Sequence, residues 1–243
     1  MTSFEKQKEP SEAFHYKPPS TEVKEKYSHI FQMDMPLKNR LIKLVFDKIV
    51  AFFVLFCTLP FLFILKLACI IEGLIIPENR GPLFFSYNAV SAGKVFKKYK
   101  IRIIKMKYID HEKAKLGDWH AFSNEWNVDS RTYIGSVVKK FYLDEIPQFF
   151  CVLKGDMCIV GPRPLAIHHY DRDIKQGNVV RKLIKGGLIG LGHVQKGTPQ
   201  MGNAVYEYEY IDKYLKYSSM SILLLDLFII WRGVKVIARG EGL

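Results

Sequence analysis

The chain has little cysteine: four residues among 243, at Cys57, Cys69, Cys151 and Cys158. None of them forms a Cys-x-x-Cys pair, and two lie inside an apolar run, which argues against a structural zinc site. So few thiols in a chain of this length also argue against a disulfide framework. The cysteines are most simply interpreted as small apolar side chains in a reducing compartment or a membrane.

Signatures of several other protein classes are missing as well. The glycines of residues 186–190 are not spaced as Gly-x-Gly-x-x-Gly, and no βαβ unit surrounds them, so a dinucleotide-binding loop is not indicated. His168, His169 and His193 lack the spacing of metal ligands. No nucleic-acid module is recognisable. The first long apolar run starts near residue 49, too late for a secretory signal.

Acidic residues are also few compared with basic ones. The 24 Asp and Glu face 36 Lys and Arg, which gives a net charge of +12. Such an excess indicates an anionic partner, which could be nucleic acid, acidic lipid or a phosphorylated substrate. Hydrophobic residues make up 49% and charged residues 25%, so the chain is neither intrinsically disordered nor a polytopic carrier.

The length suggests one large domain, or one domain with a tail. Residues 1–37 are polar, their charges alternate in sign, and Pro18 and Pro19 interrupt any helix. We therefore predict a flexible or loosely docked N-terminal tail, with a weak helical stretch around residues 22–31. The domain proper would then occupy residues 38–243.

An apolar run over residues 49–71 carries a single charge, Lys66. It is long enough to cross a hydrocarbon core, but Pro60 in its middle favours a kink. Both flanks are strongly basic, and basic flanks stay on the cytoplasmic side. Three structures remain open: a re-entrant helix that breaks at Pro60 and returns to its starting face, a single span that tolerates the proline, and a buried helix of a soluble protein.

The rest of the chain is predicted to be mainly α with a small β-hairpin, an α+β fold. Apolar residues on either side of residues 91–93 indicate the hairpin, and residues 110–130 are expected to form helix plus loop. Residues 136–141 could be a short helix or a strand. We expect a helix from Asp144 to about residue 153 that stops at Gly155. Residues 222–238 indicate an amphipathic helix on a membrane surface or on the core.

Asp144 and Glu145 are the sharpest chemical feature. Successive side chains diverge by about 100° on a helix, so the two carboxylates are not expected to share a proton. They could divide the work, with one attacking and one holding a metal or orienting the site. The alternative is that Asp144 caps a helix and Glu145 is a first-turn acid, which is the commoner situation.

Several cations could bind phosphate. Arg163 lies between Pro162 and Pro164, which fix its backbone and present the guanidinium at low entropic cost, although it could equally be a surface arginine in a stiff loop. Lys100 and Arg102 fall on one face of a predicted strand, suitable for phosphate or for a solvated edge.

One further pair of charges favours a structural interpretation. Asp129 and Arg131 stand two positions apart in a polar stretch, and we expect a turn with a local salt bridge there.

Taken in chain order, these features resemble the bacterial sugar transferases, small monotopic polyprenyl-phosphate phosphoglycosyl transferases. The resemblance runs from about residue 38 to residue 239. It rests on the proline-centred apolar run and on a series of motifs. The two most specific motifs are Leu-Asp-Glu-x-Pro-Gln at residues 143–148 and Lys-Gly-Asp-Met-x-x-Val-Gly-Pro-Arg-Pro at residues 154–164. Residues 80–85, residues 99–102 and the Asp129-x-Arg131 pair also match.

The resemblance implies a specific reaction. Such enzymes lie on the cytoplasmic face of the inner membrane through a re-entrant helix, broken here at Pro60, with the catalytic region at residues 80–243. They move a sugar-1-phosphate, usually from a UDP-sugar, to undecaprenyl phosphate and release UMP. Asp144 would be the nucleophile of a covalent intermediate, and Glu145 would help to place Mg²⁺ or the lipid phosphate.

The remaining site residues follow from the same resemblance. The phosphates and the nucleotide would be bound by Lys100, Arg102, Lys139 and Arg163, with Asp129, Arg131, Pro162 and Pro164 in support and Asp144 and Glu145 as the Mg²⁺ ligands. The partners implied are anionic membrane lipids and downstream glycosyltransferases, with no nucleic acid. The exposed C-terminal helix leaves room for a homodimer.

The chain departs from the family pattern at several positions. Members usually carry Arg-Gln where this chain has Ser86 and Tyr87, an arginine where it has Lys139, and a serine where it has Cys158. Lysine keeps the charge of arginine but loses its bidentate fork. A divergent member with unusual sugar selectivity, or one with reduced activity, would show such changes. The rival hypotheses are a non-catalytic membrane scaffold with the same fold and a basic membrane- or nucleic-acid-binding protein.

Overall fold

The computed structural model describes residues 17–195 and 197–238, most of which are helical. Two small sheets complete the mainly helical α+β fold that the sequence predicts. The helices are α1 (Thr21–Lys26), α2 (Ser28–Phe31), α3 (Leu41–Ile75), α4 (His111–Lys115), α5 (Tyr133–Lys140), α6 (Gln148–Lys154), α7 (Ile167–Lys175), α8 (Val180–Leu183), α9 (Val205–Lys216) and α10 (Ser219–Ala238).

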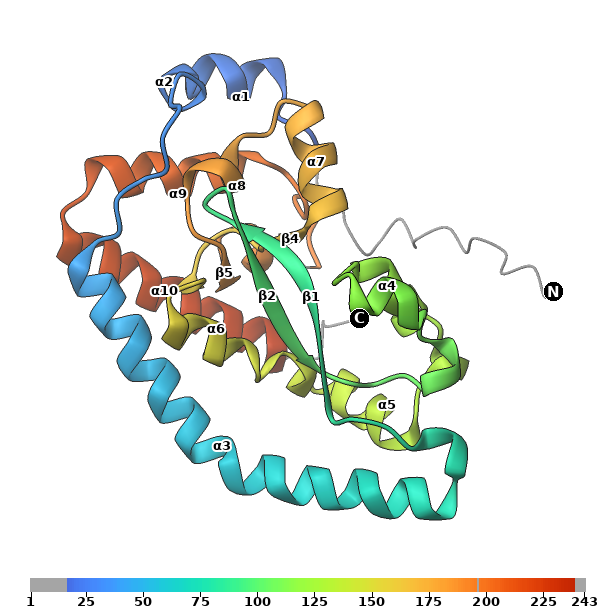
Figure 1. The fold of residues 1–243 in the computed structure, drawn as a ribbon. Helices are drawn as coiled ribbons and strands as arrows, with labels where there is room; N and C mark the ends of the chain where they lie inside the picture. The colour runs from blue at the N-terminus through green and yellow to red at the C-terminus, as the bar shows by residue number, and fades with distance from the viewer. Residues whose placement is uncertain (1–16, 196, 239–243) are drawn as a thin grey trace.

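The predicted β-hairpin is confirmed and lies at the centre of the molecule (Figure 1). Strands β1 (Phe84–Ser91) and β2 (Lys94–Ile101) pair antiparallel along their whole length. The two residues between them, Ala92 and Gly93, have φ values of 48° and 71°, the left-handed conformation that a two-residue hairpin turn requires. The short strand β4 (Leu165–Ala166) adds to the free edge of β1.

A second sheet joins β3 (Cys158–Val160) to β5 (Gly187–Ile189) in parallel. Its strands are too short to show alternation, so no sequence pattern predicts it. The glycines of β5 and its neighbours serve this pairing: a Cβ on Gly187 would lie 2.1 Å from the backbone nitrogen of Gly161. The glycine-rich stretch at residues 186–190 is therefore a site of close backbone packing.

Helix α3 is continuous and longer than the apolar run, from Leu41 to Ile75, with Pro60 inside it. It follows the outer edge of the molecule, bends about midway and meets the body at both ends (Figure 1). Thr58 Oγ1 donates to the carbonyls of Val54 and Leu55, at 2.8 and 3.2 Å, a back-bonding that often accompanies helix bending.

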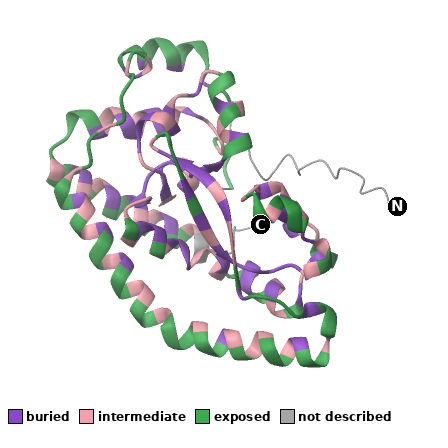
Figure 2. Cartoon of the chain, in the orientation of Figure 1, coloured by how far each residue is buried: buried purple, intermediate pink, exposed green. Residues whose placement is uncertain are grey.

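Most side chains along the middle of α3 are exposed or only partly covered (Figure 2). Only 6% of its most apolar stretch is buried, and Phe52, Phe56 and Phe63 are each more than half exposed. By length and composition α3 is able to enter a membrane. The alternative of a buried helix in a soluble protein is wrong, because such a helix would cover its apolar side chains.

Other predicted elements are confirmed with changed boundaries. Residues 136–140 belong to a helix, α5, with Phe141 as its C-cap, and the C-terminal amphipathic helix is α10. The helix expected from Asp144 begins instead at Gln148, directly after Pro147, and ends at Gly155 with φ 85°. Leu143–Glu145 forms a separate 3-10 turn, so Asp144 is not the cap of α6.

Part of the predicted tail is docked on the domain. The weak helical stretch corresponds to α1 and α2; Val23 of α1, Ile30 of α2 and Tyr27 between the two helices are buried. The ring of Phe31 stacks on Tyr208 of α9, with centroids 4.7 Å apart. These aromatic contacts explain why residues 17–37 pack despite their polar composition. Residues 1–16 lie outside the described residues.

Candidate active site

Asp144 is held in a buried position by an unusual backbone turn. Tyr142, between α5 and the 3-10 turn Leu143–Glu145, adopts a left-handed conformation with φ 56°. A tyrosine in this region carries strain that the surrounding structure must offset, and such strain tends to occur at functional sites. The turn directs Asp144 inward, where only 1% of its surface is exposed.

The Asp144 carboxylate faces two lysines from different elements. Lys100 Nζ, at the end of β2, lies 3.0 Å from Asp144 Oδ2, and Lys139 Nζ, in α5, lies 3.8 Å from the same oxygen. Lys100 also donates to Glu125 Oε2 at 3.0 Å, and Lys139 stands over the ring of Trp126, 4.9 Å from its centroid. Two ammonium groups thus stabilise negative charge on Asp144.

The pKa values of this cluster show how its charges are held. Burial alone lowers the pKa of Lys100, but Glu125 and Asp144 outweigh it and raise that pKa well above its ordinary value. Burial would raise the pKa of Glu125, yet Lys100 and Lys139 bring it below the ordinary value. Burial and the neighbouring Lys100 lower the pKa of Lys139. The cluster therefore keeps Lys100 and Glu125 charged.

Glu145 points to a different partner. Its Oε1 pairs with Nη2 of Arg163, in the loop after β3. Burial would raise the pKa of Glu145, but Arg163, Lys98 and Lys100 outweigh burial and hold it well below its ordinary value. The adjacent carboxylates thus have separate partners: Asp144 faces Lys100 and Lys139, and Glu145 pairs with Arg163. This arrangement agrees with the expectation that the two carboxylates do not share a proton.

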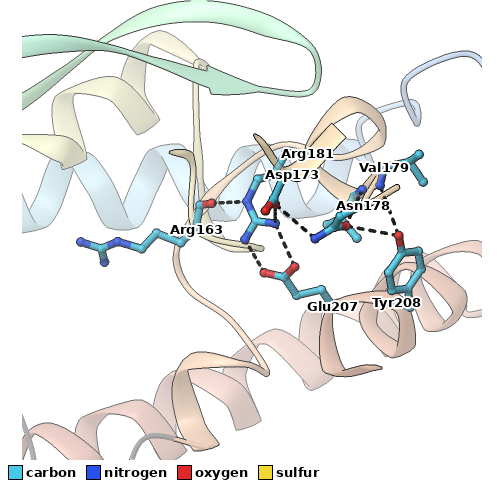
Figure 3. A network of polar contacts seen from close by, with 8 residues as sticks. Arg163, Asp173, Asn178, Val179, Arg181, Glu207 and Tyr208 are labelled. Carbon is cyan, nitrogen blue, oxygen red and sulfur yellow. Dashed lines mark hydrogen bonds and ion pairs between the residues drawn. The ribbon is translucent and has the colours of Figure 1, made fainter. Parts of the chain in front are cut away.

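A buried polar network holds the backbone of Arg163 in place (Figure 3). Its carbonyl accepts a hydrogen bond from Arg181 Nε at 2.8 Å, and its side chain extends away from the network. Arg181 donates to Asp173 at 3.0 Å and to both oxygens of Glu207, at 3.0 and 2.6 Å. A fully buried arginine with two carboxylates is a rigid support, so the network sets the place of the Pro162–Arg163–Pro164 segment.

The structure does not bring every predicted residue to Asp144. The guanidinium of Arg102 donates to the backbone carbonyls of Pro82, Ile104 and Asn79, at 2.8, 2.6 and 2.9 Å. All three acceptors belong to the chain around the end of α3 and the exit of β2. Arg102 therefore anchors this junction, whereas Lys100, two positions earlier, reaches Asp144.

Asp129 and Arg131 form a turn, as predicted, but the predicted salt bridge between them is wrong. Residues Val128–Ser130 make a 3-10 turn, and within the described part of the chain no ion pair joins Asp129 to Arg131. Arg131 Nε donates instead to the carbonyl of Glu125 at 3.1 Å. Arg131 thereby supports the residue that holds Lys100.

The carboxylates of Asp144 and Glu145 are the candidate ligands for a magnesium ion at this site, and Asp144 offers a free oxygen for it. Asp144 Oδ1 is buried without a hydrogen-bond donor in the described structure. Mg²⁺ is commonly bound by one or two carboxylates together with substrate phosphates. The described residues contain no cluster of three or more His, Cys, Asp or Glu able to hold a metal by themselves, so an ion here would depend on the substrate.

Glu125 is a site residue that the sequence patterns do not reveal. It lies in a 3-10 helix, Trp119–Trp126, whose sequence shows no regular pattern. Its contact with Lys100 spans 25 positions, and no local signal marks such a pair. Lys98 also lies near these charges, and its spacing from Lys100 on one strand places both on the same face.

Comparison of the sequence with known protein families identifies the family of this chain. The family described as "Bacterial sugar transferase" matches residues 38–240, nearly the whole described domain. The chain belongs to the bacterial sugar transferase family. The Asp144 and Arg163 motifs both lie inside the matched range, so the cluster around Asp144 lies within the part that family members share.

Individual relatives of the sugar transferase family agree with this assignment. The chain is 31% identical over 207 residues to the "UDP-glucose:undecaprenyl-phosphate glucose-1-phosphate transferase" of Escherichia coli K12, a match covering 80% of this chain and 42% of the relative. It is 31% identical over 169 residues to the "UDP-N-acetylgalactosamine-undecaprenyl-phosphate N-acetylgalactosaminephosphotransferase" of Aeromonas hydrophila, covering 68% of this chain and 37% of that protein.

A shorter relative matches over most of its length. The "Exopolysaccharide production protein ExoY" of Sinorhizobium fredii is 23% identical over 202 residues, covering 79% of this chain and 86% of the relative. The chain spans about two fifths of the length of the first two relatives, whose further segments have no counterpart in the match.

Proposed function

We propose that this protein transfers a sugar-1-phosphate from a UDP-sugar to undecaprenyl phosphate and releases UMP, the first step of assembling a lipid-linked surface glycan. One observation carries the proposal: Asp144 is a buried carboxylate with one unpartnered oxygen, held between two lysines. Relatives named as undecaprenyl-phosphate sugar phosphotransferases support the reaction class.

The chemistry takes two displacements at one phosphorus. Asp144 attacks the phosphorus that bears the sugar, the bond from this phosphorus to the bridging oxygen breaks, and UMP leaves with the electron pair. A phosphate oxygen of undecaprenyl phosphate then attacks the same phosphorus, and the bond to Asp144 breaks, which restores the carboxylate. Such a covalent path divides one difficult transfer into two easier steps.

Each displacement brings an anion to an anion, so the cations around Asp144 have a clear role. Lys100 and Lys139 both face the Asp144 carboxylate, and their charges would offset the repulsion between its attacking oxygen and the phosphate. Arg163 would bind the nucleotide phosphate, either after its ion pair with Glu145 opens or while that ion pair is kept. Bound Mg²⁺, held by Asp144 and Glu145, would neutralise phosphate charge in the same way.

We further propose that α3 enters the cytoplasmic leaflet of the inner membrane and returns to the same side. Both ends of α3 meet the body, and both flanks are basic. Helix α10 supports an interfacial position: Leu224, Leu227, Phe228 and Trp231 form an exposed apolar stripe, and Lys235 stands 3.6 Å from the centre of the Trp231 ring. The basic surface would also attract anionic lipids.

The test is nucleotide release by the full chain in nanodiscs with Mg²⁺, undecaprenyl phosphate and a panel of UDP-sugars. We expect UMP from one donor. In the same assay without undecaprenyl phosphate, release should stop at about one UMP per chain, because the sugar phosphate stays on Asp144. Release of UDP would instead indicate simple glycosyl transfer and would contradict the proposal.

Replacing Pro60 with leucine tests the re-entrant arrangement. In a variant without native cysteines, single cysteines replace Lys38 or Lys107, on the two sides of α3, and a membrane-impermeant maleimide is added to sealed vesicles. We expect both positions to react from the cytoplasmic side with Pro60 present. With Pro60→Leu, a fraction of chains should show the two ends on opposite sides, since the restored backbone hydrogen bond favours a straight span. Opposite sides in the parent chain would overturn the arrangement.

A further inference from the structure

Lys98 is a buried lysine that forms no ion pair with any described residue. It lies on β2 two positions before Lys100, so both side chains project from the same face of the strand. Only 1% of Lys98 is exposed, yet none of the described residues accepts a hydrogen bond from its Nζ or forms an ion pair with it. Its Nζ lies 5.9 Å from the centre of the ring of Tyr87, its partner across the hairpin.

The charges that surround Lys98 belong to the active site. Arg163 and Lys100 repel its ammonium group, and Glu145 attracts it. Burial first, and then Arg163, lower the pKa of Lys98 to about 7. Among the described residues, the titratable groups that act on it are Tyr87 of β1, Lys100 of β2, Glu145 of the 3-10 turn, Cys151 of α6, Arg163 after β3 and His193 of the 3-10 helix His193–Gln195.

We propose that Lys98 binds the diphosphate of the donor. Its amine is buried on the face of β2 that carries Lys100, the partner of Asp144, and none of the described residues pairs with it. A diphosphate that binds beside Arg163 and Glu145 would supply this partner. A buried amine is costly to charge alone, and a phosphate oxygen supplies the acceptor that the folded chain lacks. The inference rests on the proposed function, because it assumes that a nucleoside diphosphate occupies this site.

Binding would then draw a proton onto Lys98. At pH about 8 the free amine is mostly neutral, and an adjacent diphosphate favours its charged form. The nearby His193 and Tyr87 do not interfere, because burial lowers the pKa of His193 to about 3 and raises that of Tyr87 to about 12. The terminal phosphate of UDP is already ionised at this pH, since its last pKa lies near about 6.

The experiment measures UDP binding to the full chain in nanodiscs with Mg²⁺, by calorimetry at pH about 8 in two buffers of different ionisation enthalpy. We expect the parent chain to take up about one proton per UDP. Lys98→Met should weaken binding about tenfold or more and abolish the uptake. Lys98→Arg should retain affinity without uptake, because arginine is always charged. The matched control is Lys97→Met, an exposed lysine on the opposite face of β2, which should behave as the parent.

Two outcomes separate this inference from the proposed function. If the parent binds UDP and Lys98→Met binds it equally well, Lys98 does not contact the diphosphate and only this inference fails. Proton uptake that persists in Lys98→Met would also overturn it, and would point to Lys139, whose pKa is lowered too. If the parent fails to bind UDP at all, the proposed donor class itself is wrong. In the UMP assay, Lys98→Met should raise the KM for the donor more than it lowers kcat.

Discussion

Asp144→Asn is expected to lower UMP release by about a thousandfold or more, because an amide cannot form the bond to phosphorus that the carboxylate forms. Asparagine has nearly the same size, and Lys100 keeps its contact with Glu125 at 3.0 Å. The fold should therefore survive the change, with a stability loss of about 1–2 kcal/mol from the lost counter-charge. The assay with undecaprenyl phosphate and the productive UDP-sugar measures the effect.

Mass spectrometry of the intact chain gives the matching evidence. Incubated with the donor alone, the parent should gain the mass of one sugar phosphate, and Asp144→Asn should gain none. Asp156→Asn is the control, because this partly exposed aspartate pairs with Lys154, 3.0 Å away, and has no contact with Lys100 or Lys139. If Asp144→Asn releases UMP at the parent rate, Asp144 is not the nucleophile.

The same variant distinguishes an enzyme from a scaffold. A scaffold that keeps the fold without catalysis would support glycan assembly in cells equally well after the Asp144→Asn change, whereas the proposed enzyme would not. Salt-dependent binding of nucleic acid would be the mark of the third hypothesis, a basic binding protein. The membership in the bacterial sugar transferase family and the ordered charges around Asp144 favour the enzyme.

Asp226→Ala should be the most destabilising single change away from the site. Lys43 Nζ of α3 lies 2.6 Å from Asp226 Oδ2 of α10 and 3.6 Å from Asp47 Oδ2, and all three are buried. Tyr210 of α9 donates to Asp226 Oδ1 at 2.8 Å. Without Asp226, the buried ammonium of Lys43 keeps only Asp47, 3.6 Å away, as a counter-charge. We expect the free energy of unfolding to fall by about 3–5 kcal/mol.

Thermal unfolding of the full chain in nanodiscs measures this loss, which corresponds to roughly 10 °C in Tm. Glu112→Ala is the matched control: it removes an ion pair of similar length, 2.8 Å to Lys115, that is exposed to solvent, and should change stability by about 0.5 kcal/mol or less. The triple variant Lys43→Met, Asp47→Leu and Asp226→Leu should recover much of the loss, because no charge of the network is then buried alone. Equal Tm values for Asp226→Ala and Glu112→Ala would contradict a role for this network in joining α3 to the body.

Much of the fold follows from local patterns. Periodicity and turn residues predict the β-hairpin, the long apolar helix with its proline, the C-terminal amphipathic helix and the end of α6 at Gly155. Boundaries are harder to predict. Acidic residues before a helix commonly cap it, which places Asp144 at the start of the helix that in fact begins at Gln148, and no sequence signal reveals the left-handed turn at Tyr142.

Sequence alone specifies the chemistry available to this protein: a pair of adjacent carboxylates, a proline-framed arginine, an excess of basic residues and a helix able to enter a membrane. How these groups are used depends on the folded arrangement. Folding joins Lys100 to Glu125 across 25 positions and Lys43 to Asp226 across 183, and it turns Arg102 toward backbone carbonyls. Periodicity reports which face of an element is buried, whereas the partner of a buried charge depends on which elements pack together, because this packing brings residues distant in sequence into contact.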